Sequence, residues 1–104
     1  MSALEENIIE LGVNVSKLID DRDRLILGKT ENIKEDIIRH FFELDISLKE
    51  LFHDIQEIKE YINIDISDIE DMILEIQDID KNADNIDNIK NIYHNIINSF
   101  DNMN

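Results

Sequence analysis

Residues 37–62 read IIRHFFELDISLKELFHDIQEIKEYI and carry the most regular pattern in the chain. Apolar side chains recur along this segment at alternating steps of four and three residues, and we call them the seam: Ile37, Phe41, Leu44, Leu48, Leu51, Ile55, Ile58 and Ile62. This alternation is typical of an α-helix that packs along one face in the manner of a coiled coil. We therefore expect the seam to form the centre of the core, either within this chain or shared with a second chain.

The same segment has a second apolar face, formed by Ile38, Phe42 and Ile46. A helix with apolar residues on two faces is typically buried from two sides. We therefore expect other helices to cover the early part of this helix on both faces. Further apolar positions outside the main stripe of the first helix, at Ile9, Val13 and Leu27, favour oligomerisation or docking to another protein.

The residues before the seam predict a first helix at about 3–27 and the start of a second at 32. Ser2-x-x-Glu5 is a capping-box pattern, and Gly28 suits the residue that follows a helix. Asn32-x-x-Glu35 has the spacing to cap the second helix. Arg22 interrupts the apolar stripe of the first helix, so we expect it to pair with an acid on a neighbouring helix.

After the seam, residues 61–69 change briefly to a period of two, which predicts a helix break near 63–67. Ser67-x-x-Glu70 forms another capping box, so a third helix should cover about 67–80, although one continuous helix is the alternative. Residues 80–84 weaken the pattern again before a last segment at about 84–101. That segment has apolar residues on one arc and asparagines opposite, so its order should depend on docking.

The predicted fold class is therefore all-α: a single domain, residues 1–104, built as an antiparallel bundle with coiled-coil-like heptad packing. The bundle has three helices, or four if residues 80–84 also break the chain. Segments of similar length joined by short connections favour antiparallel neighbours.

The charge balance excludes several kinds of partner. The net charge is −15, and residues 63–104 alone hold ten acids and two bases. No basic patch is available to neutralise phosphates or to bind an anionic membrane surface, so direct nucleic-acid or membrane binding is not expected. A basic protein is the partner that this charge favours.

The location is expected to be the cytoplasm, or the host cytoplasm for a viral protein. The chain has no cysteine, starts with an acidic segment and contains no apolar run of the roughly 18 residues that cross a membrane. The abundance of Ile and Asn over Gly, Ala, Arg and Pro indicates an AT-rich genome, such as that of a low-GC bacterium, its phage or a large virus.

Catalysis and metal binding find little support in the sequence, so we predict no enzyme, no cofactor and no metal. Glu50-x-x-His53 is a lone Glu-x-x-His motif on the polar face, whereas a di-iron bundle needs two such motifs and two further glutamates. Residues 78–89 resemble a calcium loop, but Ala83 replaces the glycine of the turn and Ile89 replaces the bidentate glutamate. The serines, His40, His53 and His94 form no nucleophile or acid–base pattern, and His40 should be a helix-surface histidine near the seam.

Two functions remain. The first is a non-enzymatic interaction module that associates with itself or forms part of a helical complex, as the seam and the surplus apolar positions favour. The second is an acidic mimic of nucleic acid, of a phage or viral type, that occupies a basic nucleic-acid-binding protein. Its binding face would be four acids at helical spacing: Asp68, Asp71, Glu75 and Asp78.

Overall fold

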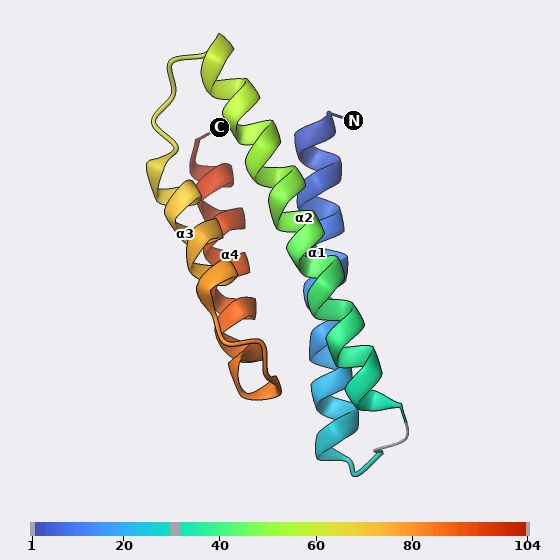
Figure 1. Ribbon diagram of the computed structural model, residues 1–104. Helices are drawn as coiled ribbons and strands as arrows, with labels where there is room; N and C mark the ends of the chain where they lie inside the picture. Colours follow the sequence, from blue (N-terminus) through green and yellow to red (C-terminus); the bar gives the residue numbers. More distant parts are fainter. Residues whose placement is uncertain (1, 30–31, 104) are drawn as a thin grey trace.

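The computed structural model describes residues 2–29 and 32–103, which form four α-helices and no strand. The helices are α1 (Ala3–Ile26), α2 (Ile33–Tyr61), α3 (Ser67–Asp78) and α4 (Ile86–Asn102), and a 3₁₀ turn at Ala83–Asn85 leads into α4. Successive helices run in opposite directions, so α1 begins and α4 ends at the same end of the molecule (Figure 1). The prediction of an all-α antiparallel bundle is confirmed, with four helices.

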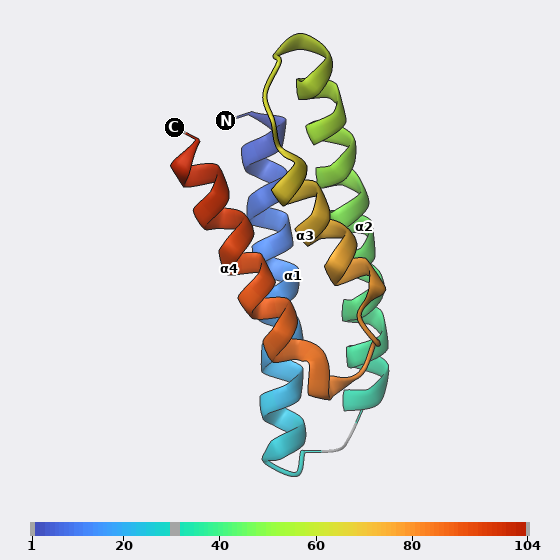
Figure 2. The ribbon, with the colours of Figure 1, turned by 90° about the vertical axis from the view of Figure 1, so that its left-hand side faces the viewer.

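The bundle consists of two helical hairpins of unequal length. The long α1–α2 hairpin packs along its whole length, while the shorter α3–α4 hairpin lies against it, with α4 next to α1 and α3 next to α2 (Figures 1 and 2). The α3–α4 hairpin ends before it reaches the turn between α1 and α2 (Figures 1 and 2). The lower part of the long hairpin therefore has fewer neighbours than the upper part.

Most of the seam lies in the core. Phe41, Leu44, Leu48, Leu51 and Ile55 are each at most 5% exposed, and Ile37 and Ile58 are partly buried. Ile62 lies beyond the end of α2 in extended backbone and is 52% exposed. The buried line therefore ends before the last residue that the pattern included. Sequence reasoning also missed three buried residues: Ile33, Ile66 and Ile92.

The second apolar face of α2 is not covered within this chain, and the expectation that it would be was wrong. Ile38, Phe42 and Ile46 are 71%, 66% and 41% exposed. On a helical wheel they lie about 140° from the middle of the seam. The α3–α4 hairpin packs on the seam side, so nothing in the described part of the chain reaches this face.

The first helix begins and ends as the sequence predicts. The Ser2 hydroxyl accepts a hydrogen bond of 3.1 Å from the backbone N–H of Glu5. At the other end Gly28 has a φ of +76°, and the Lys29 and Gly28 N–H groups donate to the carbonyls of Arg24 and Leu25 at 3.0 and 3.1 Å. This pair of bonds is a Schellman motif, which satisfies carbonyls that the helix end would otherwise leave unpaired.

Two predicted caps are wrong. Asn32 has a φ of +63° and its side chain makes no capping hydrogen bond, because the backbone there is already left-handed. Ser67 is the first residue of α3 rather than its cap, and Asp65 accepts its N–H and hydroxyl at 3.1 and 2.6 Å. The carboxylate of Asp65, and not the Ser67 hydroxyl, therefore accepts an N–H group at the start of α3. These two bonds lower the pKa of Asp65.

The chain leaves helical conformation between α2 and α3, as expected, and again between α3 and α4, where the sequence left a break or a continuous helix open. Among the described residues, none of the helices combines the length and the apolar character that crossing a membrane requires.

Candidate interaction surfaces

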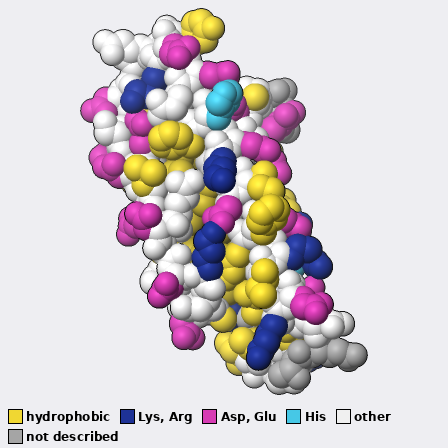
Figure 3. Space-filling view, viewed as in Figure 1, with side chains coloured by type: hydrophobic (Ala, Val, Ile, Leu, Met, Phe, Trp, Pro, Cys, Tyr) yellow, Lys and Arg dark blue, Asp and Glu magenta, His cyan; other side chains and the backbone are white. Residues whose placement is uncertain are grey.

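The outward face of the N-terminal half of α2 is the largest group of exposed apolar side chains that lies along one helix. Ile38, Phe42 and Ile46 follow one another at steps of four residues, and we call them the α2 stripe. Figure 3 shows hydrophobic side chains along this face of α2, with Lys and Arg side chains between them and most acids toward the margins. Exposed apolar residues in a line, as opposed to scattered ones, are typical of a surface that another helix covers.

Charged residues bound the stripe on both ends and both sides. Glu35 and Lys49 lie seven residues before and after Phe42, so they continue the same line along the helix. Both are exposed, and neither takes part in an ion pair within residues 2–29 and 32–103. Arg39 lies beside the stripe and pairs with Asp36 at 2.9 Å. The surroundings of the stripe are thus mixed in sign, unlike the strongly acidic α3–α4 hairpin.

Polar contacts cross the interface between α1 and α2 at a regular spacing. The polar residues of α1 in these contacts are seven residues apart, and so are their partners on α2. We call this set the polar ladder, with three rungs: Asn7–Asp54, Asn14–Ser47 and Asp21–His40. Each rung joins a residue of one helix to the residue that faces it on the antiparallel neighbour.

The two lower rungs are buried. Asn14 and Ser47 are 4% and 1% exposed, and the Asn14 amide also donates to the carbonyl of Glu43 at 3.3 Å. Asp21 is 1% exposed, and its carboxylate lies 2.5 Å from His40 Nδ1. The prediction that His40 lies on the helix surface is wrong, since its side chain is only 13% exposed.

A network of charges surrounds the lowest rung. The Arg24 guanidinium lies 3.4 Å from Asp21 and 3.0 Å from Asp36 on α2. Its hydrogen bond lowers the pKa of Asp36, and Arg39 adds to the effect. The base of the hairpin is therefore held by ionised groups as well as by apolar packing.

Ion pairs also connect the two hairpins. Arg22 pairs with Asp87 on α4, which confirms the predicted pairing with an acid on a neighbouring helix, and the bond raises the pKa of Arg22. Lys59 and Gln56 on α2 donate to the Glu70 carboxylate on α3 at 2.8 and 2.7 Å, and they lower its pKa. These contacts fix where the short hairpin lies on the long one.

The four acids of the predicted nucleic-acid-mimicking face all lie exposed on α3. Asp68, Asp71, Glu75 and Asp78 make no ion pair within the described ranges of the chain. We call them the α3 acidic face. Successive members are separated along the helix axis by about 4.5 or 6 Å. Their charges are thus available to a basic partner.

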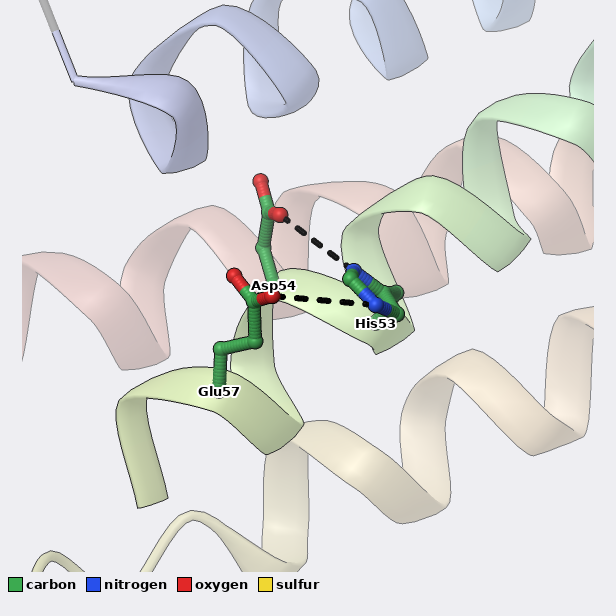
Figure 4. A group of neighbouring side chains, drawn as sticks. All are labelled: His53, Asp54 and Glu57. Carbon is green, nitrogen blue, oxygen red and sulfur yellow. Dashed lines mark ion pairs between the residues drawn. The ribbon is translucent and has the colours of Figure 1, made fainter. Parts of the chain in front are cut away.

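A cluster of possible metal ligands on α2 was missed by the sequence reasoning. His53 lies 3.8 Å from Asp54 and 3.7 Å from Glu57, and Figure 4 shows the three side chains together on α2. Their ligand atoms lie within 4.8 Å of one another. However, His53 is 71% exposed in its side chain, and Asp54 is already engaged by Asn7. An exposed set on a single helix lacks the supporting contacts that orient metal ligands in proteins. Glu50, the other residue of the lone Glu-x-x-His motif, is not part of this group.

The segment that resembles a calcium loop uses one of its expected ligand oxygens, that of Asn82, to bind the backbone. The Asn82 side chain accepts the N–H of Asp84 at 3.0 Å and so begins the 3₁₀ turn. Lys81 pairs with Asp45 on α2. The loop therefore serves to reverse the chain between α3 and α4.

The described residues line several hollows, two of which lie away from the α2 stripe and are mainly apolar. Apolar residues of α1, α2, α4 and the 62–66 connection line a pocket of about 350 Å³ at the end where α1 begins, among them Ile8, Ile55 and Phe100.

A shallow groove between α1 and α4 passes Ile9 and Val13, and there the ring of Tyr93 lies directly over Gly12. Burial raises the pKa of Tyr93. Only a glycine allows this approach, because a Cβ at position 12 would lie 3.1 Å from the Tyr93 ring carbon Cζ.

Comparisons with protein-family models, with curated proteins and with solved structures each found no match for this chain. The binding properties of the protein are therefore inferred from its own surfaces.

Proposed function

We propose that this protein is a non-enzymatic helical interaction module, which associates with itself or forms part of a helical complex. The observation that carries the proposal is the uncovered α2 stripe, where Phe42 is 66% exposed at the centre of an apolar line. Covering three such side chains removes apolar area from water and favours association. Anchors at steps of four residues are the pattern by which one helix docks on another.

Other features are consistent with the proposal. Every buried side-chain nitrogen and oxygen of the described residues has a hydrogen-bond partner within the chain, so no polar group in the core is left for a ligand to bind. The absence of cysteine and the acidic composition support a cytoplasmic setting, in a host cell if the protein is viral. That the chain is not an enzyme and needs no cofactor stays a prediction.

Phe42→Glu tests the proposed function. The labelled protein is sedimented in buffer and in an extract of its source cells, beside Leu74→Glu as the matched control. Leu74 is 47% exposed on α3, outside the α2 stripe, so its substitution adds the same charge elsewhere. We expect the wild type and the control to sediment faster than a 12.3 kDa monomer, whereas Phe42→Glu should sediment as the monomer. A wild type that is monomeric in both media would contradict the proposal.

The α3 acidic face supports a second candidate function, a mimic of nucleic acid that binds a basic protein. Its four exposed carboxylates have no cationic neighbour in an ion pair in the described chain, so their field is directed outward. Its test is binding to basic nucleic-acid enzymes at low and high salt. Asp68→Lys with Asp71→Lys should abolish binding, while Glu57→Lys with Glu60→Lys, of equal charge, should retain it. This function would be excluded if the binding affinity were the same at low and high salt, or if the α3 substitutions left it unchanged.

A further inference from the structure

The charge of the molecule is distributed so that the N-terminal half of α2, which bears the α2 stripe, is nearly neutral. Residues 32–49 contain four acids and three bases, whereas residues 63–103 contain ten acids and two bases. The α3–α4 hairpin lies on the seam side of α2, away from the stripe. Two copies of this chain can therefore bring their stripes together while their strongly acidic hairpins stay on the outside.

The ends of the α2 stripe carry opposite charges at equal distances from its centre. Glu35 precedes Phe42 by seven residues and Lys49 follows it by seven. If two α2 helices cross in antiparallel fashion at Phe42, Glu35 of each copy faces Lys49 of the other, at both ends of the contact. A parallel arrangement would instead place Glu35 against Glu35 and Lys49 against Lys49, which is repulsive.

From these two observations we infer that the partner of the α2 stripe is a second copy of this chain, docked through α2 in antiparallel orientation with Phe42 against Phe42. The inference rests on the proposed interaction function and specifies its surface and occupant. The contact is isologous, because the same patch is used by both copies and the pairing closes at two.

The size of the contact indicates a transient dimer. The stripe exposes on the order of 300 Å² of apolar surface per copy, and the aliphatic stems of the neighbouring lysines and Arg39 extend it. The total lies below the roughly 1,200 Å² at which stable interfaces of standard size begin. Association is therefore expected to depend on protein concentration.

The test exploits the symmetry of the charges. Glu35→Lys alone places lysine against lysine at both ends of the dimer, and Lys49→Glu alone places glutamate against glutamate. Each variant should therefore dimerise about tenfold more weakly than the wild type in sedimentation equilibrium. An equimolar mixture of the two variants should recover dimerisation, because each lysine then faces a glutamate. The double variant Glu35→Lys with Lys49→Glu should also dimerise like the wild type.

Both substituted residues are exposed on α2, and helical circular dichroism checks that the variants are folded. Because the chain has no cysteine, a second measurement is available that leaves the stripe intact. Glu35→Cys mixed with Lys49→Cys should be linked by a short bismaleimide, while Glu35→Cys mixed with Tyr61→Cys should not. Tyr61 is 86% exposed but lies at the far end of α2.

The outcomes separate this inference from the proposed function. A wild type that dimerises, with a variant mixture no tighter than either variant alone, overturns the antiparallel contact and leaves self-association standing. A wild type that is monomeric at about 0.5 mM, far above micromolar affinities, overturns the second copy as occupant. In that case the extract experiment with Phe42→Glu still decides whether the stripe binds a different helical protein.

Discussion

At the scale of single residues, the buried carboxylate of Asp21 is the side chain on which stability depends most sharply. Asp21 is 1% exposed and bound to His40 and Arg24, so both lose a partner if it is removed. A buried polar group without its partner retains the cost of leaving water and gains nothing in return.

Asp21→Ala should accordingly reduce the free energy of unfolding by about 3 kcal/mol. Asp20→Ala is the matched control, because Asp20 is the exposed neighbour on the same helix and its loss should change stability by less than about 0.5 kcal/mol. Urea unfolding followed by circular dichroism measures both. If the two substitutions changed the free energy of unfolding equally, the Asp21–His40 rung would make no particular contribution to stability.

Acid should destabilise the protein, because several carboxyl groups have lower pKa values in the folded state than in the unfolded state. Neighbouring cations lower the pKa of Asp36, Glu43 and Glu70, so these groups bind fewer protons in the folded state than in the unfolded state. Their contribution is present above their unfolded pKa values and is lost as the pH falls through the folded ones. Glu10 acts in the opposite sense, because burial and the nearby Glu50 raise its pKa.

With Asp65, whose pKa is also lowered, four lowered carboxyl groups outweigh one raised group, so the midpoint of thermal unfolding should fall as the pH decreases from about 5 to about 3. Lys59→Met removes the charged partner of Glu70 and should make this fall shallower. A midpoint that rises throughout this range would mean that relief of the general repulsion among the acids dominates instead.

At the scale of elements, the contact between α1 and α4 depends on the pairing of Gly12 with Tyr93. Gly12→Ala gains helix propensity but forces the Tyr93 ring away from α1, because the new Cβ would overlap the hydroxyl.

We expect Gly12→Ala to destabilise the wild type by about 1 kcal/mol and to be neutral or stabilising in a Tyr93→Phe background, where the hydroxyl is gone. A double-mutant cycle by urea unfolding gives the coupling energy between the two positions. No coupling would mean that α4 can shift to accommodate the methyl group.

The elements also show what the sequence could reveal and what it could not. The seam and the helix breaks were predictable because they depend on local spacing and on residues that disfavour helix. The cap at Asn32 was not, since the same side chain suits both a capping position and left-handed backbone. The exposure of Ile38 and Phe42 was also not predictable, because it depends on which face of α2 the α3–α4 hairpin covers, and spacing alone does not give this.

The candidate surfaces were predictable to different degrees for the same reason. The α3 acidic face could be placed from the helical periodicity of its four acids. The polar rungs could have been noticed as hydrophilic residues at positions 7, 14 and 21 within an apolar stripe, and again at 40, 47 and 54. Which residue of one set faces which residue of the other depends on the turn between the helices, and spacing alone does not give it.

At the scale of the whole molecule, the two hairpins divide charge and apolar surface between them. The α3–α4 hairpin carries most of the excess negative charge and covers the seam, while the α1–α2 hairpin carries the α2 stripe on its other side. A molecule arranged in this way can be kept from unspecific aggregation by its net charge and still offer one patch of nearly balanced charge for association.

The polar ladder has a consequence for how the long hairpin finds its alignment. Apolar side chains repeated along both helices tolerate a slide of seven residues, because one leucine or isoleucine then replaces another. Such a slide leaves two polar pairs but loses the third, since it would bring Asp21 against Ile33 in one direction and His40 against Gly28 in the other. The buried Asp21–His40 rung at the end of the ladder therefore favours the observed alignment of α1 and α2 over alignments shifted by seven residues.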